Sequence, residues 1–281
     1  MKKRFFSIVI VLISILVVVI FSSGCKSSDP NLLQAVRDQI KKTSGEVSIE
    51  DMESMNTLFA NNKEIKNLSS LESAVNLQSI SMNNNQIIDI SSLAKLKDIR
   101  IISMGNNKIT DISPISKLTK LEVLVFNNNQ ISDISALSNL TNLYQLNIDY
   151  NNVTDITPLS GLINLKTVVL GNNPIADISV LGELANLESL SLNECKISDI
   201  TIFSKLTKLK QLILNKNQIT DVTAISEIKS LEILWLDNNE ITDISPLKNL
   251  PNLKELKIKG NPITDASQID ELKKAGVEVD F

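Results

Sequence analysis

One 22-residue pattern occurs nine times without insertion, from Asn76 to Lys273. Positions 2, 5, 7, 12, 15, 18 and 21 hold an apolar residue in all nine copies, although only 43% of the chain is hydrophobic. A period of this length predicts a stack of identical units, because no single unit could bury its own apolar side. Such stacks usually present a surface for binding rather than a site for catalysis.

The spacing of the apolar positions changes within each copy. Positions 5 and 7 alternate with polar sites, which is the period of a strand. Positions 12, 15, 18 and 21 recur every three residues, a period typical of a 3₁₀ helix or an extended turn. Position 17 is proline in Pro114, Pro158 and Pro246 and follows Ser or Thr, an order that resembles a helix cap and a first-turn proline. Each copy therefore predicts a short strand, a turn and a narrow return segment, and stacking predicts a parallel sheet.

Position 10 forms a polar column through the copies. Because an amide offers both donors and an acceptor, we expect this column to satisfy the buried backbone of neighbouring turns. The column is Asn85, Asn107, Asn129, Asn151, Asn173, Cys195, Asn217, Asn239 and Asn261.

Position 14 forms a second polar column and is aspartate in every copy. We expect each aspartate to cap the turn that follows it. The column should face solvent without the close oxygen cluster that calcium needs, so no metal site is predicted. Its members are Asp89, Asp111, Asp133, Asp155, Asp177, Asp199, Asp221, Asp243 and Asp265.

The motif LxxLxLxxNxIxDIxxL resembles the bacterial leucine-rich repeat of the internalin-like, 22-residue class. The resemblance covers repeats 76–273 and extends to a helical N-terminal cap with a degenerate first repeat at 31–75 and a short C-terminal cap at 274–281. It implies an α/β solenoid. We expect a shallow right-handed arc with the parallel sheet on its concave face and 3₁₀ or irregular segments on its convex side.

Residues 1–24 predict a lipoprotein signal peptide. Three basic residues precede the apolar stretch Phe5–Phe21, and small residues lead into Cys25. This order resembles the bacterial lipobox, which implies lipidation of Cys25, a short tether over 25–30 and an extracytoplasmic protein anchored to the bacterial cell membrane. The alternatives are an uncleaved membrane anchor, near the lower length limit for a span, and cleaved, soluble export.

The composition argues against catalysis and against nucleic acid as a partner. The chain has no histidine, and lipidation of Cys25 would leave Cys195 alone, so neither an activated thiol nor a disulfide is expected. Removing three basic residues with the signal leaves 25 basic against 32 acidic residues, which disfavours phosphate binding. No phosphate-binding, dinucleotide-binding or calcium-binding motif is present. We therefore expect a monomeric, non-enzymatic protein without a cofactor.

A ligand is expected on the strand face that alternates with the buried positions, at positions 4, 6 and 8. Trp235, the single tryptophan, falls at position 6, where we expect it to be largely solvent-exposed and to contact a ligand. For the β-branched residues on this face, strand propensity alone is the alternative explanation. The predicted contacts are Trp235, Ile213, Ile233, Asp237, Tyr144, Tyr150, Val125 and Val169.

The composition of this face favours a protein as the ligand. The alternative is an envelope polysaccharide, or a structural role in the envelope. Sugar sites usually stack rings on several exposed aromatic side chains, and this face has few.

Overall fold

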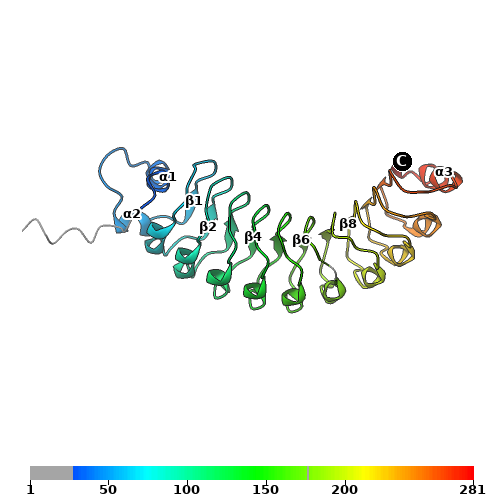
Figure 1. Ribbon diagram of the computed structural model, residues 1–281, viewed down its shortest axis with the longest axis horizontal. Coiled ribbons are helices and arrows are strands. Elements are labelled where there is room, and N and C mark those ends of the chain that lie inside the picture. The colour runs from blue at the N-terminus through cyan, green and yellow to red at the C-terminus, as the bar shows by residue number, and fades with distance from the viewer. Residues whose placement is uncertain (1–27, 176) are drawn as a thin grey trace, which may run out of the picture.

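A computed structural model describes residues 28–175 and 177–281. The described chain forms one open arc (Figure 1), built on a single parallel sheet whose eleven strands follow one another in sequence order. The 3₁₀ helices lie along the outer, convex edge of the arc, and the sheet lies on its concave side. The expected solenoid with an α/β repeat is therefore confirmed.

The N-terminal cap consists of α1 (Pro30–Ile40) and α2 (Ile49–Glu53), followed by the degenerate repeat with β1 (Thr57–Phe59) and η1 (Ser69–Ser73). The nine copies contribute the strands β2 (Ser79–Ser81), β3 (Ile101–Ser103), β4 (Val123–Val125), β5 (Gln145–Asn147), β6 (Thr167–Val169), β7 (Ser189–Ser191), β8 (Gln211–Ile213), β9 (Ile233–Trp235) and β10 (Glu255–Lys257).

The first eight copies return through 3₁₀ helices, as the threefold spacing predicts. These are η2 (Ser91–Lys95), η3 (Ser113–Ile115), η4 (Ser135–Leu137), η5 (Thr157–Leu159), η6 (Ser179–Glu183), η7 (Thr201–Lys205), η8 (Thr223–Glu227) and η9 (Ser245–Asn249). In the ninth copy the α-helix α3 (Ser267–Lys274) takes this place and leads to β11 (Glu278–Asp280), which closes the sheet.

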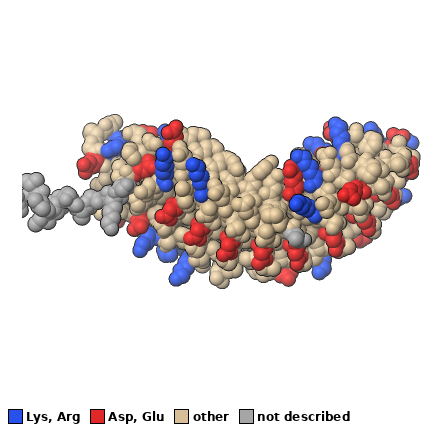
Figure 2. Space-filling model, viewed as in Figure 1, with Lys and Arg blue, Asp and Glu red and all other residues tan. Residues whose placement is uncertain are grey.

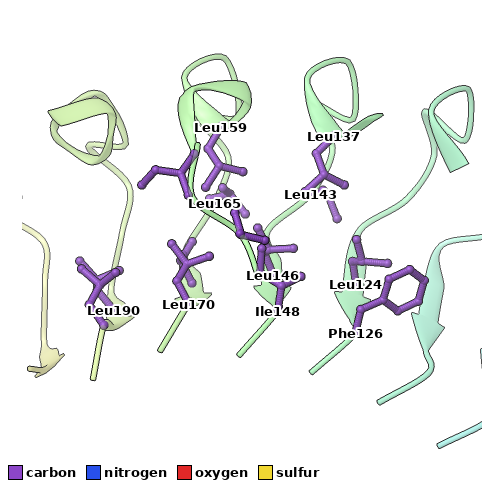
Figure 3. Packing of buried hydrophobic residues seen from close by; sticks show 14 of the residues in the cluster. Leu124, Phe126, Leu137, Leu143, Leu146, Ile148, Leu159, Leu165, Leu170 and Leu190 are labelled. Carbon is purple, nitrogen blue, oxygen red and sulfur yellow. The ribbon is translucent and has the colours of Figure 1, made fainter. Parts of the chain in front are cut away.

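Equivalent positions of neighbouring copies lie opposite each other in the sheet, so each repeat position forms a straight file. In β4 and β5, for example, Leu124 pairs with Leu146. The files of positions 5 and 7 meet the files of the return segments in the core, which Figure 3 shows for several copies in the middle of the arc. The same core cluster extends from the N-terminal cap to the C-terminal end of the arc. Leu124, Phe126 and Leu137 have no exposed surface there. Burying apolar files end to end is what stabilises a stack of units that have no core of their own.

The asparagine column forms the expected ladder between copies. Nδ2 of Asn129 donates to the carbonyls of Met104 and Phe126 at 3.0 Å each, and Oδ1 accepts from the N–H of Ile109 at 2.9 Å. Met104 and Ile109 belong to the preceding copy, so one side chain joins the backbones of two units. Equivalent bonds are made by Asn85, Asn107, Asn151, Asn173, Asn217, Asn239 and Asn261.

Cys195 interrupts this ladder between the fifth and sixth copies. Its Sγ lies 3.6 Å from the carbonyl of Leu170, but a thiol is too weak an acceptor to replace an amide oxygen. The N–H of Ile175, which that oxygen would serve, donates instead to the carbonyl of Asn173 in its own copy at 2.8 Å. Burial raises the pKa of the free Cys195 thiol to about 11. Cys195 is therefore a buried structural residue, as expected.

Each aspartate of position 14 caps the turn after it. Asp111 Oδ1 accepts from the N–H of Ser113 at 2.7 Å, and the other eight copies repeat this bond. The sequence order suggested Ser113 itself as the cap before Pro114. That assignment was wrong, because Ser113 is the first residue of η3 and the aspartate supplies the acceptor. Figure 2 shows acidic side chains in a row along the convex edge.

The predictions for Cys25 and for the stretch Phe5–Phe21 lie outside the described residues. Within residues 28–175 and 177–281, no helix has both the length and the apolar character needed to span a bilayer. The helix α1 begins at Pro30 with Asp29 as its N-cap, so the fold starts just before the expected boundary at residue 31.

Replacing Asn239 by alanine should destabilise the solenoid. The N–H of Ile219 would lose its acceptor, and the carbonyls of Leu214 and Leu236 would each lose one of two amide donors. An unpaired buried N–H costs about 1–3 kcal/mol, and we expect the free energy of unfolding to fall by that amount. Urea denaturation measures it. Glu240→Ala, at the exposed next residue, is the control, and equal stability of the two variants would contradict the role of the ladder.

Acid should also weaken the solenoid. Hydrogen bonds from the Ser or Thr two residues on hold the pKa of six capping aspartates below its usual range: Asp133, Asp177, Asp199, Asp221, Asp243 and Asp265. A carboxyl with a lowered folded pKa contributes stability above its unfolded pKa of about 3.9, and this stability is lost as the pH falls through the folded value. The urea midpoint should therefore decline from about pH 5 downward. Asp221→Asn should decline less steeply, and an identical slope would count against the caps.

Candidate ligand-binding face

The concave face presents positions 4 and 6 of each strand, bordered by position 8 at the turn. The expected alternation holds along the sheet: the central residue of each strand is buried, and most of the flanking residues are partly exposed. Val123 is more covered than expected, at 9% exposed. Because the strands are in register, side chains of one position stand next to each other across the face, so apolar residues in successive copies become neighbours.

Trp235 lies on β9 and is held by the next strand. Its indole Nε1 donates to Glu255 Oε1 at 2.9 Å, and Nζ of Lys257 lies 3.7 Å from the centre of the ring. The expectation that Trp235 is largely exposed was wrong, since the side chain is partly buried. The physical reason is the register: Lys257 stands directly opposite Trp235, and a cation is attracted to the face of an indole.

The surroundings of Trp235 combine an apolar side with a charged side. Ile213 is its partner on β8, and Ile233 lies two residues earlier on the same strand. On the other side, Lys257 Nζ pairs with Glu255 at 3.5 Å. A cleft of about 250 Å³ continues from there to the end of the sheet, lined by Glu255, Leu256, Lys257, Glu278, Val279 and Asp280. The ring is thus fixed in one orientation, which lowers the entropic cost of a contact with a ligand.

Asp237, at position 8 of the same copy, forms hydrogen bonds with the two neighbouring copies. Its N–H donates to Asn215 Oδ1 at 2.9 Å, and its Oδ1 accepts from the N–H of Lys259 at 2.8 Å. These bonds join three successive copies at the border of the face. Asp237 therefore supports the site beside Trp235, and its carboxylate is partly occupied by the backbone.

The remaining predicted contacts lie in the middle of the arc. Val125 on β4 and Val169 on β6 are partly exposed on the sheet, and Tyr144 and Tyr150 lie on either side of β5 with 41% and 55% of their surface exposed. Four strand spacings separate β5 from β9, roughly 19 Å. The structure therefore divides the predicted contacts into two groups, one around β8 and β9 and one around β4 to β6.

The comparisons with known proteins agree with this architecture. The family model for leucine-rich repeats (two copies) matches residues 75–117, 119–161, 145–183, 185–227 and 229–274. An internalin from Listeria monocytogenes is 36% identical, with a TM-score of 0.84 over 89% of this chain and 74% of its own. This chain belongs to the leucine-rich repeat family and to its internalin-like class.

Two further solved structures are similar to the chain. Internalin C2 from Listeria monocytogenes is 28% identical, with a TM-score of 0.65 over 82% of this chain and 93% of its own. A leucine-rich repeat protein from Leptospira interrogans is 22% identical, with a TM-score of 0.62 over 83% of this chain and 74% of its own, and shows the fold alone. No curated protein sequence matches the chain.

The sequence reading missed a stripe of charges along one border of this leucine-rich repeat face. Position 3 alternates in sign over the last five copies, from Lys166 to Lys254, and Glu188 lies between Lys166 at 3.7 Å and Lys210 at 2.9 Å. Arg100 and Glu122 pair at 2.9 Å farther toward the N-terminus. Reading position 3 down the copies would have shown the alternation. Exposed pairs of this kind contribute little stability, so the stripe matters chiefly for the electrostatics of the face.

Asp149 was also missed as a perturbed group. It stands at position 8 next to Tyr150, where burial raises the pKa of its carboxyl despite a hydrogen bond from Asn172 at 3.3 Å. In the described part of the chain, no group of three or more His, Cys, Asp or Glu residues is placed to hold a metal ion.

Proposed function

We propose that this chain is a membrane-tethered, extracytoplasmic bacterial lipoprotein that binds a protein ligand on the concave face of its solenoid. The observation that carries the binding part is the cluster at Trp235, a single tryptophan fixed on the exposed sheet face between two isoleucines and an ion pair. Tryptophan is enriched at the energetic centres of protein interfaces. The internalin-like family supports the choice of a protein as the ligand.

The shape of the face supports the same function. An open sheet with short, partly exposed side chains such as Ser81 and Ser103 offers area without a deep pocket, which suits a macromolecule better than a small molecule. The Trp235 cluster adds an apolar anchor with a polar rim, the usual anatomy of a protein interface.

The exposed pair Tyr144 and Tyr150 favours a second candidate, an envelope polysaccharide. Aromatic rings with 41% and 55% of their surface exposed could stack on sugars. They lie beyond opposite ends of β5, so a sugar chain would have to cross the face along the strand to contact both. A structural role in the envelope remains the other alternative to ligand binding.

A pull-down from native envelopes with the mature solenoid as bait tests the choice of ligand. We expect a protein to be recovered, and recovery of glycan alone would contradict the proposal. Trp235→Ala should then weaken binding of the recovered protein by about 2 kcal/mol, a factor of roughly 30. Glu240→Ala, outside the face, is the control. The thermal midpoint of each variant separates a loss of binding from a loss of folding.

The tether part of the proposal rests on the lipobox-like residues before Cys25 and on the position of the fold after it. The helix α1 begins at Pro30, five residues beyond Cys25, so a lipid on that cysteine would hold the folded domain directly.

Metabolic labelling with a palmitate analogue tests lipidation. We expect the wild-type protein to be labelled and Cys25→Ser to be unlabelled. Label that persists in Cys25→Ser would refute the assignment. An unlabelled wild type that keeps residues 1–24 would support the uncleaved anchor instead, and one that has lost them would support soluble export.

A further inference from the structure

Asp29 locks the start of α1 onto the degenerate repeat. Its Oδ1 accepts from the N–H groups of Asn31 and Leu32 at 3.0 and 3.3 Å, which caps α1. Its Oδ2 accepts from the N–H groups of Lys66 and Asn67 at 2.7 and 3.2 Å, just before η1. Burial raises the pKa of this carboxyl, but the four N–H donors outweigh it and leave the pKa below its usual value. The residue is therefore a charged clamp at neutral pH.

This clamp limits the length of chain between a lipid on Cys25 and the folded domain. Only four Cα-to-Cα steps separate Cys25 from Asp29. Fully extended, they span at most about 14 Å. The clamp holds the far end of this segment on both α1 and the degenerate repeat, so chain from the cap cannot lengthen the tether unless those bonds break.

The length of the arc then sets the largest distance between Cys25 and any part of the concave face. Eleven strands have ten gaps of roughly 4.8 Å, about 48 Å along the sheet. A cap helix of roughly 10 Å diameter at each end brings the arc to about 70 Å. With the tether, no part of the face lies farther than about 85 Å from a lipidated Cys25. The Trp235 cluster, two strands before the end of the sheet, lies within this distance.

The charge of the N-terminal cap does not attract it to an anionic membrane surface. Residues 29–75 contain five basic and eight acidic side chains, so anionic lipid headgroups would not attract this end electrostatically. The covalent tether alone would then set the distance between the bilayer and the solenoid.

We infer that the ligand of the concave face is a protein of the same membrane, either integral or lipid-anchored. The inference rests on the proposed lipidation of Cys25. A tether of this length keeps the concave face within about 85 Å of the membrane, so the face meets proteins of that membrane at a high effective concentration. A partner on another cell would have to approach the bilayer to within the length of the arc.

The test uses the full-length protein in its own cells, with a photo-cross-linking amino acid at one of three concave positions, Val125, Val169 or Ile213. One variant carries roughly forty additional Gly and Ser residues between Ser27 and Ser28, with a root-mean-square span of roughly 35 Å. The matched control carries the same insert after Phe281. Both keep Cys25 and the Asp29 clamp, and palmitate labelling is followed in every variant.

We expect adducts with proteins that remain in the membrane fraction after the wall is removed. The longer tether should lower their yield about threefold, because the reach grows from about 85 Å to about 120 Å and the effective concentration falls with the volume that this reach encloses. The control insert should leave the yield unchanged. An unchanged or higher yield, or adducts in the wall fraction or the medium, would overturn the inference. A missing palmitate label in the wild type would show instead that the proposed tether itself has failed.

Discussion

The solenoid depends on one amide side chain, the position 10 asparagine, in eight of its nine copies. In the turns after the strands, exposed residues flank position 10, whose side chain is buried in most copies, and the backbone groups that it reaches lie in the interior without water to bond with. The asparagine at position 10 supplies both kinds of hydrogen bond that these groups need. Its Nδ2 donates to backbone carbonyls of two copies, and its Oδ1 accepts from a backbone N–H of the preceding copy. Successive asparagines also share carbonyls: Leu214 accepts from both Asn217 and Asn239. The ladder is therefore continuous on each side of Cys195, and it joins the backbones of neighbouring copies beneath the strands of the concave face.

Most of the fold could be predicted from the sequence because the repeat samples each environment many times. Apolar columns, the ladder and the aspartate column each occur in nearly every copy, so single-copy variation does not obscure them. The structure at the ends and at Trp235 arises from contacts that occur once. Lys257 over Trp235 could have been foreseen by pairing residues 22 apart, but its effect on exposure depends on side-chain conformation. The second pair of bonds made by Asp29 joins residues 37 and 38 apart, which no periodic pattern contains.

For the candidate site too, the features that repeat in every copy could be predicted and the contacts that occur once could not. Which residues lie on the concave face follows from strand alternation, and the structure agrees. Their grouping does not follow, since Tyr144 and Tyr150 flank one strand whereas Trp235 lies four strands away. The face therefore offers a partner two separate areas of contact, with the paired charges of position 3 along the border. A ligand that uses both areas must be large enough to cover several copies, which suits a folded protein.

Cys195 gives this array a mechanical weak point. In a one-dimensional stack each copy is stabilised only by its interfaces with its neighbours. The weakest interface therefore decides where cooperative unfolding stops. The amide bridge is missing between the fifth and sixth copies, although the sheet continues through them. Under tension the solenoid would open there first, and the half with the clamp and the half with the tryptophan would separate while the backbone keeps them joined.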